Sequence, residues 1–311
     1  MSRSAGTSPN RHEPGESTSL SMLTCNQLDP GVFIVVLTVL ALFIGSFLNV
    51  VIHRLPKMME QDWRAQCVDV LGLADPALPA KQRYSLSQPR SECPHCGHVI
   101  SPIENLPVLS FLWQRGRCRA CHGRISWRYP VVEVSSAVLV AVVAWHFGCG
   151  VQALWAAVLT FALLCLAFID FDTQYLPDSI TLPILWLGIA CNLYGVFTSL
   201  EASVIGAIAG YLCLWLVYHA FKLLTKKEGM GHGDFKLLAL LGAWMGWQAL
   251  PAIVILSSVL GSLVGIGLIV SGGRDRNLPM PFGPYLAGAG WITLIWGAKL
   301  TDGYLGFIGS P

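Results

Sequence analysis

The chain has 311 residues, of which 54% are hydrophobic and only 12% are charged, and its mean hydropathy is +0.57. A soluble globular protein carries about twice that charged fraction, so the composition is typical of a membrane protein. The net charge is only +2 and the basic residues form no continuous run, which excludes general nucleic-acid binding.

The N-terminal residues differ in composition from everything that follows. Residues 1–30 are rich in serine, proline and glycine, and we expect a disordered tail there. Beyond them, eight apolar stretches approach the length of about 20 residues that a helix needs to cross a bilayer. The stretches are 31–53, 130–148, 151–169, 179–199, 202–221, 235–250, 251–271 and 283–299. We therefore expect an all-α polytopic membrane protein with about eight transmembrane helices. Six or seven spans remain the alternative, because Pro251 could mark a kink instead of a turn.

The distribution of positive charge predicts the orientation of these helices. Of the 20 lysines and arginines, eleven lie in residues 54–129, four lie between residues 222 and 236, and Arg274 and Arg276 precede the last stretch. Because positive residues accumulate in cytoplasmic loops, eight spans place all three segments in the cytoplasm. The expected organisation is a first transmembrane helix (31–53), a cytoplasmic insertion between helices 1 and 2 (54–129), a seven-helix membrane domain (130–300) and a C-terminal tail (301–311).

The cytoplasmic insertion contains two CxxC pairs, Cys93 with Cys96 and Cys118 with Cys121. Each pair can present two thiolates on a tight turn, and two such turns close a tetrahedral zinc site with no open coordination position. Two redox motifs are the alternative, but the cytoplasm keeps thiols reduced and no thioredoxin-like βαβ pattern surrounds them. We expect structural zinc bound by the four cysteines, because a segment with few large apolar residues gains folding free energy from the metal.

Two aspartates stand at the edges of apolar stretches. Asp170 ends the third stretch, and Asp234 begins the sixth within the tetrad Gly231–Asp234. The expected topology places both at the cytoplasmic boundary of the membrane, where an ionisable group is costly and indicates function. Two facing carboxylates in a poorly hydrated site share one proton, so that one can activate water while the other polarises a peptide carbonyl. The pair predicts an aspartic peptidase.

Other acids could take one of these roles. Residues two apart on a helix differ by about 200° in direction, so Asp170 and Asp172 cannot both face Asp234. We interpret Asp172 as structural or solvated and Asp178, which follows a proline, as a cap of the next helix. Asp234 could itself be a helix cap, and Glu133 is either a surface acid or part of a second site.

Several motifs occur here in an order that resembles the bifunctional prepilin leader peptidases of type IV pilus and type II secretion systems. They are Gly-Ser-Phe-Leu-Asn-Val-Val-Ile-His-Arg-Leu-Pro at 45–56, the paired CxxC motifs with Glu104-Asn-Leu-Pro-Val-Leu-Ser between them, Arg128-Tyr-Pro-Val-Val-Glu133, Ile169-Asp170 followed by Leu176-Pro177-Asp178, and Gly231-His-Gly-Asp234-Phe-Lys-Leu-Leu. The aspartate pattern of that family maps onto Asp170 and Asp234.

The resemblance implies a multi-pass inner-membrane enzyme whose active site and zinc domain face the cytoplasm. Such enzymes cut the short basic leader from prepilins and pseudopilins after a glycine, and many then N-methylate the new amino terminus with S-adenosylmethionine. The resemblance associates the cysteine-bearing segment with methylation. No glycine-rich fingerprint locates the binding site of that cofactor, so its residues stay unassigned.

Two other classes of protein remain as alternatives. A transporter or channel with a zinc-stabilised loop would place its acids near the bilayer centre and would show inverted repeats. A presenilin-like protease would share the aspartate pair but cut within a transmembrane helix. Acids at one membrane edge favour cleavage at a leader junction over both alternatives.

Overall fold

The computed structural model of the protein describes residues 29–72, 84–226, 230–271 and 280–308, with side chains described as far as residue 297. The tail expected at residues 1–30 lies almost entirely outside the described residues. Within the described residues, the chain is helical, and two isolated β-bridges are its only extended pairings. The helices are α1 (Pro30–Leu71), η2 (Ile103–Asn105), α2 (Leu109–Trp113), α3 (Arg128–Phe147), α4 (Val151–Thr173), α5 (Asp178–Asn192), α6 (Leu200–Thr225), α7 (His232–Met245), η3 (Trp247–Ala249), α8 (Leu250–Val270) and α9 (Gly283–Ile308).

Each of the eight expected stretches forms a helix, namely α1 and α3 to α9. In the described part of the chain, five helical segments are long and apolar enough to cross a membrane: α1, α3, α4, α6 and η3 with α8. Helices α5 and α7 have only 15 and 14 residues. The alternative in which Pro251 only kinks a continuous helix is wrong, because α7 ends at Met245 and α8 begins at Leu250. Gly246 between them takes a φ of 82°, which glycine adopts without strain.

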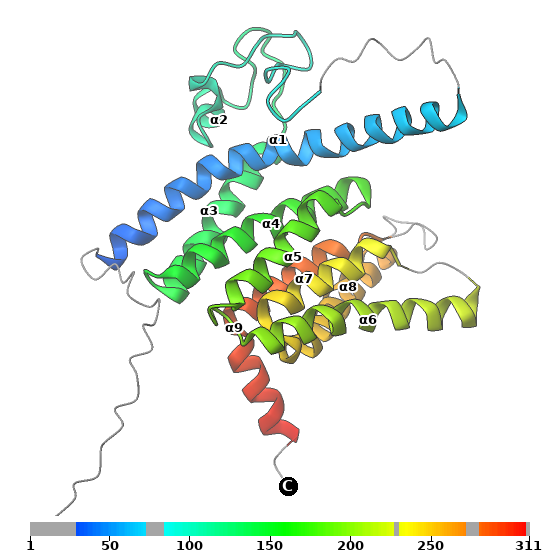
Figure 1. Cartoon of the computed structure of the whole chain (residues 1–311). Coiled ribbons are helices and arrows are strands. Elements are labelled where there is room, and N and C mark those ends of the chain that lie inside the picture. Colours follow the sequence, from blue (N-terminus) through cyan, green and yellow to red (C-terminus); the bar gives the residue numbers. More distant parts are fainter. Residues whose placement is uncertain (1–28, 73–83, 227–229, 272–279, 309–311) are drawn as a thin grey trace, which may run out of the picture.

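Helix α1 is longer than the first span expected at residues 31–53. It has 42 residues and passes through Pro56 to Leu71, so the first part of the predicted insertion is helical. Figure 1 shows this helix running along the outside of the bundle, with the cysteine-bearing segment and α2 on its outer side. Trp63 in the extension packs edge-on against Tyr175, with 5.1 Å between ring centroids. The extension therefore reaches the connection between α4 and α5.

Helix α7 lies at the centre of the second half of the bundle. It packs against α5, α6 and α9, and its Phe235 and Trp244 side chains are fully buried. Gly206 of α6 approaches α7 so closely that a Cβ there would lie 2.3 Å from the Gly242 carbonyl oxygen. Small residues let helix backbones approach in this way. The short central helix is thus held by its neighbours.

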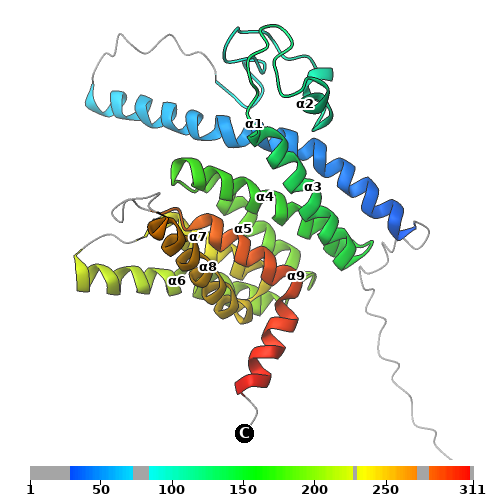
Figure 2. The ribbon, with the colours of Figure 1, turned by 180° about the vertical axis from the view of Figure 1, so that it is seen from behind.

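The C-terminal ends of α4, α6 and α8 lie at the same end of the bundle as the N-terminal ends of α5, α7 and α9 (Figures 1 and 2). An up-and-down arrangement of helices brings these ends together although they are far apart in the sequence. Any site built from these ends combines residues from several helices.

Candidate active site

Asp170 lies in the last turn of α4, where the apolar helix ends. Its side chain is buried, and its Oδ2 accepts a hydrogen bond of 2.9 Å from the backbone N–H of Gly283. A Cβ at Gly283 would lie 2.6 Å from the same oxygen, so only glycine fits at this position without displacing the carboxylate. The start of α9 therefore holds Asp170 through its backbone.

Asp234 is the third residue of α7 and is also buried. The helix begins after Gly231, which occupies the cap position, so the interpretation of Asp234 as the capping residue is wrong. Gly233 packs against Leu176, and a Cβ at Gly233 would lie 2.8 Å from the Leu176 Cβ. This close approach brings the first turn of α7 to the connection that follows Asp170.

The two aspartates thus come from α4 and α7 but share one end of the bundle. They are close enough for the charge of Asp170 to act on Asp234. Both carboxylates are withdrawn from solvent, and a glycine lies beside each of them, Gly283 beside Asp170 and Gly231 beside Asp234. This is the environment in which two carboxyl groups share a proton.

The competing acids are already paired with cations. Asp172 forms an ion pair with Arg128 at the start of α3, which agrees with its interpretation as a structural acid. Asp178 does not cap α5, because Pro177 occupies the cap position. The Asp178 carboxylate instead lies 2.6 Å from the Lys236 ammonium, and this partly exposed pair links α5 to α7.

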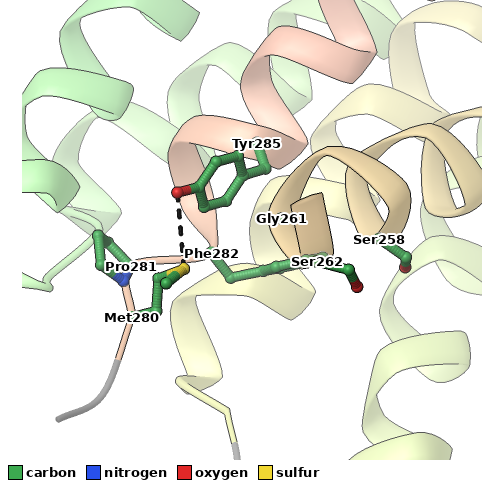
Figure 3. Close-up of a pocket in the computed structure, with 7 residues that line it drawn as sticks. All are labelled: Ser258, Gly261, Ser262, Met280, Pro281, Phe282 and Tyr285. Carbon is green, nitrogen blue, oxygen red and sulfur yellow. Dashed lines mark hydrogen bonds between the residues drawn. The ribbon is translucent and has the colours of Figure 1, made fainter. Parts of the chain in front are cut away.

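The segment Met280–Gly283 also belongs to the site, because Gly283 contacts Asp170, but the sequence did not identify it as part of the site. Its only signal is a glycine placed between Phe282 and Pro284 at the start of the last apolar stretch. Figure 3 shows the segment beside a cavity of about 280 Å³ between α8 and α9, where the Tyr285 hydroxyl donates to the Met280 sulfur at 3.5 Å. Among the described residues, no acidic or basic side chain lines this cavity. The segment contributes to the site through the Gly283 N–H, which donates to Asp170.

The four cysteines form a second cluster, in which all Sγ atoms lie within 4.8 Å of one another. The Cys93 and Cys121 sulfurs are 3.8 Å apart, and the Cys96 and Cys118 sulfurs are 4.0 Å apart. Four thiolates at the usual Zn–S distance of about 2.3 Å in a tetrahedron would be about 3.8 Å apart. The structure therefore brings together four ligands that could hold a metal ion.

Two small hairpins present these cysteines in the same way. The β-bridges Glu92–Val99 and Arg117–Arg124 each enclose one CxxC pair. In both hairpins, the fourth residue after the first cysteine has a positive φ, 69° at Gly97 and 56° at His122. The backbone N–H groups that follow Cys93 and Cys118 point at these sulfurs and lower the pKa of both thiols, which favours the thiolate that a metal requires.

Two glutamates form further connections: Glu104, which is partly buried, within the cysteine-bearing domain, and Glu133, which is buried, between that domain and the helices. Glu104 accepts the Ser101 N–H at 2.9 Å and lies 3.3 Å from His98, and the Ser101 backbone contact lowers its pKa. Glu133 in α3 is buried and accepts the N–H of Val108 at 2.8 Å, so the interpretation of Glu133 as a surface acid is wrong.

Comparisons with known proteins place the two halves of the chain in two matching domain families. Residues 39–147 match the bacterial peptidase A24 N-terminal domain, and residues 157–266 match the type IV leader peptidase family. No solved structure matches the chain.

Three curated relatives share the name prepilin leader peptidase/N-methyltransferase. The protein of Stutzerimonas stutzeri is 52% identical over 279 residues, which are 90% of this chain and 96% of the relative. The protein of Aeromonas hydrophila is 53% identical over 89% of this chain and 95% of its own length. The protein of Pseudomonas aeruginosa is 50% identical over 90% of this chain and 96% of its own length. With half of its residues identical over nearly its whole length, the chain belongs to the type IV leader peptidase family.

Proposed function

We propose that the protein is an aspartic endopeptidase that removes the basic leader from type IV prepilins or pseudopilins and then N-methylates the new amino terminus. The observation that carries the peptidase assignment is the buried pair of Asp170 and Asp234 at one end of the helical bundle. The names of the relatives support both activities.

The surroundings of the two aspartates suggest a division of labour. The Gly283 N–H donates to Asp170, and a donated hydrogen bond favours an ionised carboxylate. We therefore assign Asp170 as the general base that takes a proton from water. Asp234 then carries the shared proton and donates a hydrogen bond to the scissile carbonyl, which becomes more electrophilic. Attack by water breaks the peptide bond without a covalent enzyme intermediate.

We further propose that α1 and α3 to α9 form the membrane part, with the catalytic end at the cytoplasmic face of the inner membrane. The segments that carry most of the positive charge adjoin this end: the insertion before α3, the connection from α6 to α7 and the connection from α8 to α9. Positive loops face the cytoplasm. A leader that is basic and cytoplasmic would enter on this side.

The four-cysteine cluster is proposed to hold structural zinc. The sulfur–sulfur distances fit a tetrahedral thiolate site, and two equivalent hairpins supply all four ligands. Four cysteines leave no coordination position for a substrate, so the metal would fold the domain and take no part in peptide hydrolysis. S-adenosylmethionine is proposed as the methyl donor because the relatives are named N-methyltransferases.

The two other classes of protein are less well supported. A channel or transporter does not account for a match with the type IV leader peptidase family. A presenilin-like protease would cut within a transmembrane helix, whereas the Asp170 and Asp234 pair lies where helices end.

The proposed function is tested with the full chain in detergent, a synthetic prepilin segment and S-adenosylmethionine. We expect mass spectrometry to show cleavage after the glycine that ends the basic leader and a product heavier by one methyl group. Cleavage inside the apolar segment would instead support the presenilin-like alternative. Absence of any cleavage would contradict the peptidase assignment.

A further inference from the structure

A large cavity lies between the cysteine-bearing domain, which comprises residues 84–127, and helices α1 and α3. Its volume is about 610 Å³, within the range of about 300–1,000 Å³ of sites for small molecules. Its floor is formed by α1 and α3, including Asn49 and Glu133, and its walls come from the cysteine-bearing domain, including Ser110 and Phe111. The proposed peptide hydrolysis uses no residue of this cavity.

Two hydrogen-bonded contacts, made by Arg54 and Glu133, fix the walls of the cavity to its floor, and a third, made by Asn49, joins the two helices of the floor. The Arg54 guanidinium donates to the carbonyl of Ser85 at 3.1 Å, and the Asn49 amide donates to the carbonyl of Tyr129 at 3.1 Å. The N–H of Val108 donates to Glu133. The cavity is therefore held open by specific contacts between the two parts of the protein.

Glu133 is the notable residue on the floor. It is only 7% exposed and lines the cavity, and within the described part of the chain no lysine, arginine or histidine lies within ion-pairing distance of it. A buried carboxylate without a cation is costly unless a ligand supplies the charge. Val108 adopts a φ of 59°, an unfavourable conformation for a β-branched residue, in the turn from which its N–H donates to Glu133.

The walls have a different character from the floor. Arg54 of α1 reaches from the floor and lies over the Tyr84 ring of the walls at 5.6 Å, and Arg119 and Phe111 of the walls also line the cavity. Guanidinium groups bind carboxylates, and aromatic rings stack on heterocyclic bases. A ligand with a carboxylate and a purine base fits these side chains, and S-adenosylmethionine has both groups, which leaves the Glu133 carboxylate for a second, cationic group.

The position of Glu133 also suits the amine that peptide cleavage produces. Glu133 lies in the second turn of α3, where a Cβ at Gly45 of α1 would lie 3.0 Å from the Glu133 Cα. Arg128, one turn earlier in α3, is paired with Asp172, two residues beyond the catalytic Asp170. The floor of the cavity and the proposed peptidase site thus lie at the same end of adjacent helices.

We propose that this cavity is the methyl-transfer site, with S-adenosylmethionine bound against the cysteine-bearing domain and Glu133 binding the α-ammonium group of the cleaved substrate. The inference rests on the proposed function and deepens it. The Glu133 carboxylate holds the ammonium group and accepts one of its protons. The lone pair of the resulting amine forms a bond to the methyl carbon, and the carbon–sulfur bond breaks with its electron pair remaining on sulfur. The products are a methylated ammonium group and a neutral thioether.

Two pairs of variants of the full chain test the location of the site and the role of Glu133. Ser110→Trp fills the cavity, and Leu112→Trp is its control because Leu112 is 63% exposed and is not among the lining residues. Glu133→Gln keeps the shape of the side chain but removes its charge, and Glu60→Gln is its control because Glu60 is exposed on α1. Binding of S-adenosylmethionine is measured by calorimetry without prepilin, and cleavage and methylation are measured by mass spectrometry.

For Ser110→Trp we expect a Kd for S-adenosylmethionine raised by about tenfold or more, with cleavage retained. For Glu133→Gln we expect a similar Kd and retained cleavage, but methylation reduced by about tenfold or more. Both controls should behave as the wild type. An unchanged Kd in Ser110→Trp overturns the location, and normal methylation, or a parallel loss of cleavage, in Glu133→Gln overturns its role. A wild type that neither binds the donor nor methylates would instead refute the methyltransferase part of the proposed function.

Discussion

The backbone of one glycine supports the carboxylate that we assign as general base. Gly283 donates to Asp170, and the space where its Cβ would lie is filled by the Asp170 carboxylate oxygen. Asp170 and Asp234 could be predicted from their depth in the apolar pattern. Gly283 could not, because its partner is 113 residues away and the contact depends on how α4 packs beside α9.

Gly283→Ala should therefore impair cleavage without unfolding the protein. The new methyl group must push the Asp170 carboxylate aside, and misplacing a catalytic group lowers the rate steeply, so we expect a loss of about tenfold or more in kcat. Gly288→Ala in the same helix is the control, because no atom within 4 Å would meet its Cβ. Equal cleavage rates for the two variants, measured with a prepilin peptide, would show that the Gly283 contact is unimportant.

At the scale of elements, the hairpins and the short helices show what the amino-acid pattern can and cannot predict. Two CxxC pairs were enough to predict a four-cysteine cluster, because the ligands lie within short local turns. The bounds of α5 and α7 were not predictable from hydropathy, which extended the expected stretches to residues 199 and 250. Hydropathy does not distinguish helical residues from apolar residues in the turns that follow.

Removing one ligand of the cysteine cluster should release the metal and loosen the domain. For Cys118→Ser we expect the zinc content of the purified chain to fall from about one per chain to near zero, because three thiolates bind more weakly than four. Limited proteolysis should then cut between residues 84 and 127. Cys67→Ser is the control, because Cys67 is exposed and outside the cluster. The zinc content is measured by inductively coupled plasma mass spectrometry. If Cys118→Ser kept one zinc ion per chain, this ligand set would be excluded.

At the scale of the whole molecule, the topology brings distant parts of the sequence to one end of the bundle. The positive-charge distribution predicted a common side for the insertion and the catalytic edge, and the helix ends do meet there (Figures 1 and 2). The cavity between the cysteine-bearing domain, α1 and α3 could not be predicted, because its lining combines residues that are up to 87 positions apart, from Ser46 to Glu133.

The proposed orientation predicts which side of the membrane each end of the bundle faces. Cys67 lies on the exposed extension of α1, and Tyr194 lies in the connection between α5 and α6, at the opposite end. A membrane-impermeant maleimide should label a cysteine introduced by Tyr194→Cys in intact cells, but should label Cys67 only after the inner membrane is opened. Peptide mapping distinguishes the two sites. Labelling of Cys67 in intact cells would show that this end of the bundle faces the periplasm, which would contradict the proposed orientation.

The central claim is that Asp170 and Asp234 act together as the peptidase pair. The most direct measurement is prepilin cleavage in membranes that contain equal amounts of the wild type, Asp170→Asn, Asp234→Asn or Asp172→Asn. Asparagine keeps the size of the side chain but cannot share the proton, so we expect complete loss of cleavage in the first two variants. Asp172→Asn should still cleave, because Asp172 only pairs with Arg128. Cleavage by either of the first two variants at the wild-type rate would contradict the account.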